Sequence, residues 1–303
     1  MAFGQGLLGK IFLPGFADAG ADASFQASIP PTGTATDEEL PLAQADLLIQ
    51  RFAPKVWTAE GPNVNFFGFP YPTRMVAIQL LDGSAWIWSP IALTEDLAYQ
   101  VVKLVGPVKY IVSPNLLHWY ALKEWQDRFP DAKVFASPGL EERKVVKDIF
   151  FCDTLNNETP PEYADDLDQI IFRGGAIDEV VFFHKPSKTV IFCDLIQRHF
   201  EDDQVGFKGW LLRAEGLVGP LGSTPKEWRF AFWIHGLYPQ ARKTLDVILQ
   251  DWKPEGMVIA HGENAPEGAC VVIENCLTWI PKDPKPCCCC PHRVEEDDGL
   301  LNL

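Results

Sequence analysis

Two polar residues follow the end of one apolar run in a pattern that is typical of a reactive loop. The run Val108–Val112 stops at Ser113-Pro114-Asn115, and a segment with helical spacing begins near residue 119. Open α/β sheets position ligands and catalytic groups where a strand ends in a polar loop and continues into a helix. His118 lies at this turn and is therefore a candidate functional residue. Asn115 is a candidate for adding a carbonyl oxygen to the site or for hydrogen-bonding a substrate.

The composition restricts the class of partner. The chain has 303 residues, of which 47% are hydrophobic and 22% are charged, as is ordinary for a globular protein with a sizeable core. Its formal net charge of −15 argues against nucleic acid and anionic membranes, because phosphate groups are bound by clustered Lys and Arg. No apolar run reaches 18 residues, so no transmembrane segment is expected. The expected partner is a small-molecule substrate or ligand.

The cysteines and the N-terminal residues bear on the compartment. Cys152, Cys193, Cys270 and Cys276 lie in or beside apolar runs, which is typical of the free, buried thiols of a cytosolic protein. The segment that begins at Met1 has one early positive charge and is interrupted by Gly and Pro, so it resembles neither a signal peptide nor a transit peptide. We therefore expect a cytoplasmic protein, and a targeting role for the N-terminal segment stays open.

The periodicity of apolar residues and the turn residues predict a mixed α and β chain. Helices are expected over residues 40–52, 94–104, 119–129, 141–146 and 239–252, and a turn over residues 61–63. Strands are expected over residues 56–57, 74–81, 85–88, 108–112, 133–136, 169–173, 179–184, 189–193 and 257–260. Residues 200–228 are expected to be a long insertion with short helices. In each half, hairpins come first and strand–loop–helix units follow, which predicts an α+β fold, a four-layer αββα sandwich.

The ends of the chain differ in composition from the middle. Residues 1–40 are rich in Gly, Ala, Pro, Ser and Thr and are expected to form an irregular arm, followed by one domain over residues 41–282. Residues 283–303 contain the consecutive cysteines Cys287–Cys290 and then an acidic run. Adjacent cysteines cannot easily surround one tetrahedral ion, so we expect a disordered tail. A soft-metal site, redox sensitivity and S-acylation of that tail remain open.

Several short motifs lie at the ends of the predicted strands. They are Arg74-Met75, Asp82–Pro90, Pro114–His118, Glu179–His184, Thr189–Asp194 and Ala260–Gly262. Together, over roughly residues 50–280, they resemble the metallo-β-lactamase superfamily, and in particular a metallo-β-lactamase-like branch with a degenerate metal motif. The resemblance implies the αββα fold and is much less specific for any one reaction.

The resemblance also implies which metal ligands have been lost. The family motif His-x-His-x-Asp-His would fall on Ser113–Trp119, where Pro114 and Leu116 replace the first two histidines. His118 stands at the aspartate of the motif and Trp119 at its last histidine. A dinuclear site needs about six side-chain ligands, and Pro and Leu cannot supply them.

A reduced ligand set remains under the same resemblance. The next family histidine falls on Gly174-Gly175 and is missing, while the bridging aspartate is kept as Asp194 and the final histidine as His261. His118, Asp194 and His261 would suit one catalytic Zn²⁺ that activates a water, or a non-haem Fe(II). The implied activity is that of a mononuclear hydrolase acting on a small-molecule ester, amide or related bond.

Other roles for these residues stay open. Glu179 begins a predicted strand next to the lost ligand loop and would position substrate or shuttle protons together with Asn115. The same side chains would also suit a polar pocket without metal, in a binding or scaffold protein that keeps the fold without catalysis. A non-haem iron oxidoreductase is a weaker third hypothesis. The cofactor is accordingly one divalent metal, Zn or Fe, or none. No partner is predicted for His199 or His235.

Overall fold

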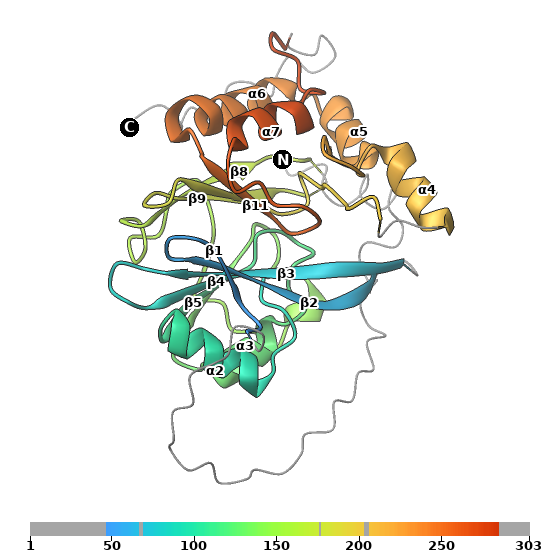
Figure 1. Cartoon of the computed structure of the whole chain (residues 1–303). Helices are drawn as coiled ribbons and strands as arrows, with labels where there is room; N and C mark the ends of the chain where they lie inside the picture. The colour runs from blue at the N-terminus through green and yellow to red at the C-terminus, as the bar shows by residue number, and fades with distance from the viewer. Residues whose placement is uncertain (1–46, 67–68, 176, 203–205, 285–303) are drawn as a thin grey trace.

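The chain forms two β-sheets that pack face to face, with helices on their two outer faces (Figure 1). This is a computed structural model, and it describes residues 47–66, 69–175, 177–202 and 206–284. The predicted N-terminal arm and the tail with Cys287–Cys290 therefore lie outside the described residues, apart from Asp283 and Pro284. The α+β fold with four layers, helix–sheet–sheet–helix, agrees with the fold class that the sequence predicts.

The first sheet has seven strands in sequence order, β1 to β7. Neighbouring strands are antiparallel from β1 to β4 and parallel from β4 to β7. The strands are β1 (Gln50–Ala53), β2 (Val56–Phe66), β3 (Phe69–Gln79), β4 (Ala85–Trp88), β5 (Val108–Val112), β6 (Lys133–Ala136) and β7 (Asp153–Thr154).

The second sheet has four strands in the order β11-β10-β9-β8. They are β8 (Leu167–Phe172), β9 (Glu179–His184), β10 (Thr189–Phe192) and β11 (Gly256–Ile259). The β8–β9 and β9–β10 pairs are antiparallel, whereas β10 and β11 are parallel. The parallel pair matters for function, because the carboxyl ends of both strands meet at one edge of the sheet.

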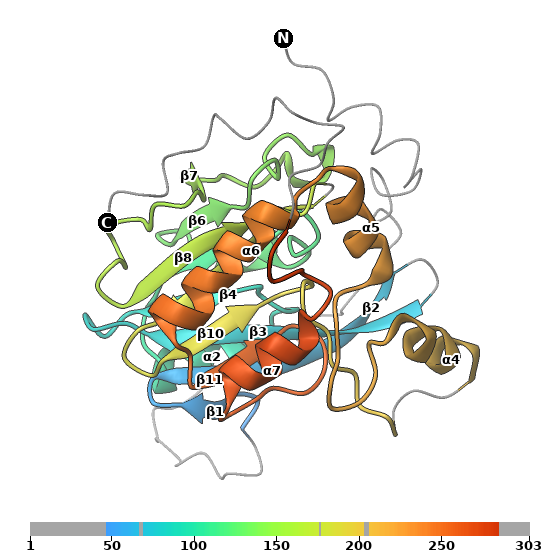
Figure 2. The same ribbon diagram turned by 90° about the horizontal axis from the view of Figure 1, so that it is seen from above.

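Six α-helices are described, and four of them cover the outer faces of the sheets (Figures 1 and 2). Helices α2 and α3 lie against the seven-stranded sheet, while α6 and α7 lie across the four-stranded sheet. The helices are α2 (Glu95–Leu104), α3 (Leu122–Arg128), α4 (Gly206–Glu215), α5 (Lys226–Ile234), α6 (Tyr238–Asp246) and α7 (Ala269–Cys276), with a 3₁₀ turn η2 (Lys144–Val146) and a π-helical segment η3 (Val247–Trp252).

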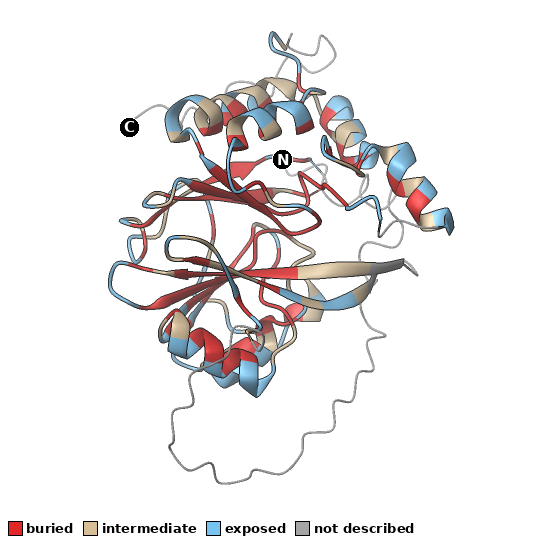
Figure 3. Ribbon diagram, in the orientation of Figure 1, coloured by how far each residue is buried: buried red, intermediate tan, exposed pale blue. Residues whose placement is uncertain are grey.

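The side chains of β4 show how the sequence builds the layers. Ala85 and Ile87 belong to the apolar cluster under α2 and α3, and Trp86 and Trp88 belong to the cluster between the two sheets. This alternation follows from the two-residue period of a strand. The ring of Trp86 meets that of Phe182 from the second sheet edge to face, at 5.0 Å between centroids. Buried residues are accordingly concentrated in the sheets and on the inner faces of the helices (Figure 3).

Two of the local predictions are wrong because tertiary contacts override a local pattern. The helix predicted up to residue 52 gives way to β1, which pairs with β2. The turn predicted at residues 61–63 lies inside β2, where the register shifts between Gly61 and Val64. A Cβ atom on Gly61 would lie 2.3 Å from Thr73 Oγ1, so the glycine allows close packing instead of a turn. Helix α7, finally, was not predicted.

Candidate functional site

Four candidate residues meet where strands of both sheets end. Asn115 and His118 follow β5, Asp194 follows β10, and His261 follows β11. The structure brings all four side chains together around the carboxylate of Asp194, which is 5% exposed. The parallel pairing of β10 with β11 explains why residues 67 positions apart in sequence reach the same point.

The two carboxylate oxygens of Asp194 have different neighbours. Oδ2 accepts a hydrogen bond of 2.7 Å from Nδ2 of Asn115 and lies 3.3 Å from Nε2 of His118. Oδ1 lies 3.0 Å from Nε2 of His261. Burial by itself would raise the pKa of Asp194, but the two histidines hold it well below its usual range. The carboxylate is therefore ionised at neutral pH.

The other nitrogen of each histidine is held by a group outside the cluster. Nδ1 of His118 lies 2.6 Å from Oγ of Ser89, and Nδ1 of His261 lies 2.9 Å from the carbonyl oxygen of Pro72. Because a carbonyl only accepts, Nδ1 of His261 donates the proton in that bond. Burial lowers the pKa of His261, while the hydrogen bond to the Asp194 carboxylate acts in the opposite direction.

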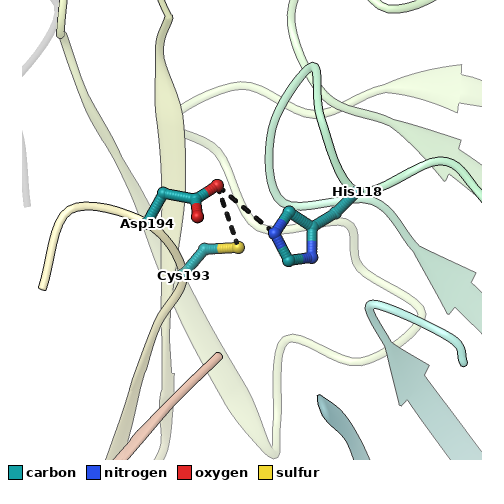
Figure 4. Close-up of side chains that lie close together, drawn as sticks. All are labelled: His118, Cys193 and Asp194. Atoms are coloured by element: carbon teal, nitrogen blue, oxygen red, sulfur yellow. Dashed lines mark hydrogen bonds and ion pairs between the residues drawn. The ribbon is translucent and has the colours of Figure 1, made fainter. Parts of the chain in front are cut away.

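Cys193 is a neighbour of the cluster that the sequence pattern did not single out. The ligand atoms of His118, Cys193 and Asp194 all lie within 4.8 Å of one another (Figure 4). The thiol sulfur is 3.8 Å from Oδ2 of Asp194. Burial, reinforced by the charge of Asp194, raises the thiol pKa well above its usual value. The sequence predicted only a free, buried thiol at this position, and the described residues do contain such a thiol.

The arrangement around Asp194 can be tested as a cation site. Ligand atoms on one ion at about 2.1 Å lie about 3.0–3.4 Å apart when they are neighbours in its coordination shell. The N–O separations of 3.3 Å to His118 and 3.0 Å to His261 fall in this range. Metal-binding histidines also usually have the second ring nitrogen hydrogen-bonded, as both do here. These two separations suit ligands of one divalent cation, although the group whose ligand atoms all lie within 4.8 Å of one another is His118, Cys193 and Asp194, without His261.

Glu179 supports this cluster from behind. Its side chain is completely buried, and its carboxylate accepts backbone N–H bonds of 2.7, 2.7 and 2.8 Å from Cys193, Asp194 and Leu195. Burial, together with the charge of Asp194, raises its pKa to about 8. Both of its oxygens are thus used to fix the turn that carries Asp194. Among the described residues, Glu179 has no hydrogen bond to the side chain of His118 or His261.

A second polar network lies beside His261 and was missed by the sequence analysis. Tyr71 donates a 2.5 Å hydrogen bond to Oε1 of Gln197, and Nε2 of His199 lies 3.1 Å from the same oxygen. The Tyr71 ring also meets the His261 ring edge to face at 4.7 Å. Tyr71 and Gln197 are 126 residues apart, so no local spacing could have revealed their contact.

Arg74 and His184 have structural environments. The Arg74 guanidinium contacts the Glu60 carboxylate at 2.5 Å and the carbonyl oxygen of Ile259 at 2.5 Å. His184 is fully buried, and its Nδ1 lies 2.6 Å from Oγ of Ser187. His184 therefore belongs to the hairpin between β9 and β10 and lies away from the cluster.

A pocket of about 400 Å³ opens onto the cluster. His118, Asp194 and His261 form one end of it, and neither Asn115 nor Glu179 is among the side chains that line it. Lining residues outside the cluster come from β3, from the loop after β4, from α4 and α5 and from the segment between these helices; they include Tyr71, Thr73, Ser89, Pro90, Lys208, Leu211, Leu212, Leu217, Glu227 and Trp228. The predicted insertion at residues 200–228 thus supplies a wall of the pocket.

Comparison of the sequence with known families gives a match. A family model described as a domain of unknown function (DUF4336) matches residues 54–202. No curated protein sequence matches the chain. None of the helices in the described part of the chain has the length and apolar character needed to cross a membrane.

Solved structures similar to this chain share its fold at low sequence identity. A structure of TMB-1 has a TM-score of 0.51 with 13% identity, and it covers 76% of this chain and 95% of its own. The DIM-1 metallo-β-lactamase has a TM-score of 0.50 with 13% identity, and the match covers 76% of this chain and 95% of that structure. A metallo-β-lactamase from Hirschia baltica has a TM-score of 0.50 with 13% identity, and the match covers 78% of this chain and 98% of that structure. The two facing sheets, their outer helices and these similarities establish that the chain has a metallo-β-lactamase-like fold.

Proposed function

We propose that the protein is a metal-dependent hydrolase that acts on a small molecule with an ester, amide or related bond. His118, Asp194 and His261 would hold one divalent cation, and zinc or ferrous iron would suit two imidazoles and one carboxylate. The observation that carries this proposal is the position of Asp194, whose two oxygens face the Nε2 atoms of two different histidines. A cation there would act as a Lewis acid on the substrate carbonyl and would lower the pKa of a water molecule.

The remaining residues of the site would hold these ligands in place. Asn115 donates to Oδ2 of Asp194 through Nδ2 and accepts from the backbone N–H of Leu117 through Oδ1, so it fixes the carboxylate to the loop that carries His118. Glu179 fixes the turn at Asp194 through three backbone N–H groups. We therefore propose positioning roles for Asn115 and Glu179. The pocket beside the ligands would exclude water from an apolar substrate.

We further propose that the site holds one ion and not two. Pro114, Leu116 and Gly174 stand where the resembled family has histidines, and their side chains offer no ligand atom. Cys193 is the candidate for an additional ligand, but its raised pKa opposes the thiolate form that binds metals. The degenerate motif thus supports a mononuclear centre.

One observation favours a metal-free binding protein as the alternative. Both oxygens of Asp194 have partners within the chain, from Asn115, His118 and His261. A buried carboxylate that is satisfied by an amide and two histidines is stable without a metal if one of the rings carries an extra proton. In that case the pocket would bind a small molecule without reacting with it.

Elemental analysis separates the two functions. Purified protein that has never been exposed to chelator is expected to contain about one equivalent of Zn, Fe or Mn and to hydrolyse simple esters. An Asp194→Asn variant is expected to lose both the metal and the activity, whereas Asp178→Asn, a change at a half-buried residue next to Glu179 in sequence, is expected to keep both. Absence of stoichiometric metal in the wild-type protein would overturn the hydrolase proposal and favour the metal-free binding protein.

A further inference from the structure

Several apolar side chains line the pocket. Leu211 and Leu212 of α4 line it together with Leu217, Trp228 and Leu117 from the loop that carries His118. Apolar groups account for most of the lining in pockets that recognise organic ligands, with a few polar groups fixing orientation. The polar side chains around Asp194 would contact the reacting end of a ligand, and the other polar lining residues include Gln197, Lys208, Glu215 and Glu227. A ligand would therefore have one polar reacting end and an apolar body.

The charged side chains on the pocket wall disfavour binding of a ligand whose body is anionic. Glu215 and Glu227 line the pocket, while Lys208 contributes a positive charge. The Lys208 ammonium is 5.7 Å from the centre of the Tyr71 ring, and Glu215 accepts a 2.9 Å hydrogen bond from the backbone N–H of Lys226. Two acidic groups against one basic group, in a chain with a net charge of −15, disfavour a second carboxylate or phosphate on the ligand.

We infer that the pocket selects uncharged ligands with an apolar chain or ring, whose ester or amide carbonyl lies at the His118–Asp194–His261 end. This inference rests on the proposed function only for the identity of the reacting group. The apolar body would lie along Leu211, Leu212 and Trp228, which the α4–α5 segment brings to the pocket. The size of the pocket, about 400 Å³, is within the usual range for small-molecule sites.

Helix α4 also carries an exposed apolar surface outside the pocket. Phe207 and Trp210 of α4 stack on each other at 5.7 Å between ring centroids and are 69% and 61% exposed, and neither lines the pocket. An apolar molecule that simply adheres to the protein would use this exposed aromatic pair. Trp210 is adjacent to Leu211, so the two positions give matched variants on one helix, one outside the pocket and one inside it.

Binding of unreactive ligands to the full chain tests the inference without requiring catalysis. The probes are methyl ketones with four, six, eight and ten carbons, and the alkyl carboxylates of the same lengths, measured by titration calorimetry on protein treated with chelator. Ketone affinity is expected to rise about three- to fourfold per added methylene until the pocket is filled, because each buried methylene contributes about 0.8 kcal/mol. The carboxylates are expected to bind at least about tenfold more weakly than ketones of equal length.

Two variants test where the alkyl chain of the ligand lies on the protein. Leu211→Gln is expected to reduce the dependence on chain length, whereas Trp210→Gln leaves it unchanged. Affinity that does not vary with chain length, tighter binding of the carboxylates, or an equal loss in Trp210→Gln would each overturn the inference. The ketones contain no hydrolysable bond, so these results stand whether or not the protein proves to be a hydrolase. A hydrolase with no preference for apolar chains would refute this inference alone.

Discussion

His261 presents Nε2 to Oδ1 of Asp194 at 3.0 Å, while Nδ1 of the same ring is bound to the carbonyl of Pro72. The carbonyl requires the proton on Nδ1, so a neutral His261 ring directs a lone pair at an ionised carboxylate. Two acceptors at this distance repel each other unless a proton or a cation lies between them. This contact is the physical basis for proposing a metal at the site, and it leads to the first prediction.

Replacing His261 by Ala should release most of the bound metal, whereas Cys193→Ala should retain it. The expected difference follows from the raised pKa of the buried Cys193 thiol, which makes it a poor ligand beside a neutral imidazole. Metal content per chain, measured by mass spectrometry of the purified variants, checks this. His235→Ala, on a histidine outside the cluster, is the control. If His261→Ala retains the metal and Cys193→Ala loses it, Cys193 and not His261 is the metal ligand.

Replacing Ser89 by Ala should weaken metal binding by about 10- to 100-fold while leaving the fold intact. Oγ of Ser89 lies 2.6 Å from Nδ1 of His118 and fixes the orientation of that ring, and loss of such outer hydrogen bonds typically has this effect. Competition with a chelating dye measures the affinity. Ser137→Ala, at another buried serine, should have no such effect. Equal affinities for wild type and Ser89→Ala would remove Ser89 from the site.

Replacing Glu179 by Ala should lower the free energy of unfolding by at least about 3 kcal/mol, because three buried backbone N–H groups lose their acceptor. Urea denaturation of the metal-free protein measures the loss. Asp178→Asn should cost about 1 kcal/mol or less, since its ion pair with Arg173 is at the surface. If Glu179→Ala is as stable as Asp178→Asn, water replaces the carboxylate and the positioning role is wrong.

Acid should destabilise the protein partly through His184. Burial lowers its pKa to about 4, below the value of about 6.5 in the unfolded chain, so the unfolded state binds more protons between these values. Stability from this residue is thus fully present above pH 6.5 and is lost as the pH falls towards 4. The loss is at most about 3 kcal/mol.

The His184→Gln variant isolates this contribution. It should show a smaller decrease in unfolding free energy between pH 7 and pH 4 than the wild-type protein, as measured by urea denaturation at each pH. Phe182→Leu, a change in the same buried strand that removes no titrating group, controls for general destabilisation and should retain the wild-type pH dependence. Parallel curves for wild type and His184→Gln would show that folding does not lower the pKa of His184.

Much of the fold was predictable because local patterns determine it. Alternation in β4 separates Trp86 and Trp88 from Ala85 and Ile87, and the strands β6 and β9 have the predicted bounds. The sequence also indicated Asn115 and His118, which follow an apolar strand, and the resemblance to the metallo-β-lactamase superfamily added Asp194 and His261. A polar residue at the end of such a strand is detectable because the change from buried to polar residues is abrupt.

Tertiary structure decided what those residues contact. Ser89, Pro72 and Tyr71 reach the histidines from β3 and from the end of β4, over separations that no sequence spacing encodes. It also decided that the Glu179 carboxylate binds backbone N–H groups, because a buried carboxylate takes whatever donors the neighbouring turn presents. The sequence thus determined which side chains were available at the sheet edge. Packing of the two sheets against each other determined that His118 and His261 approach opposite oxygens of Asp194.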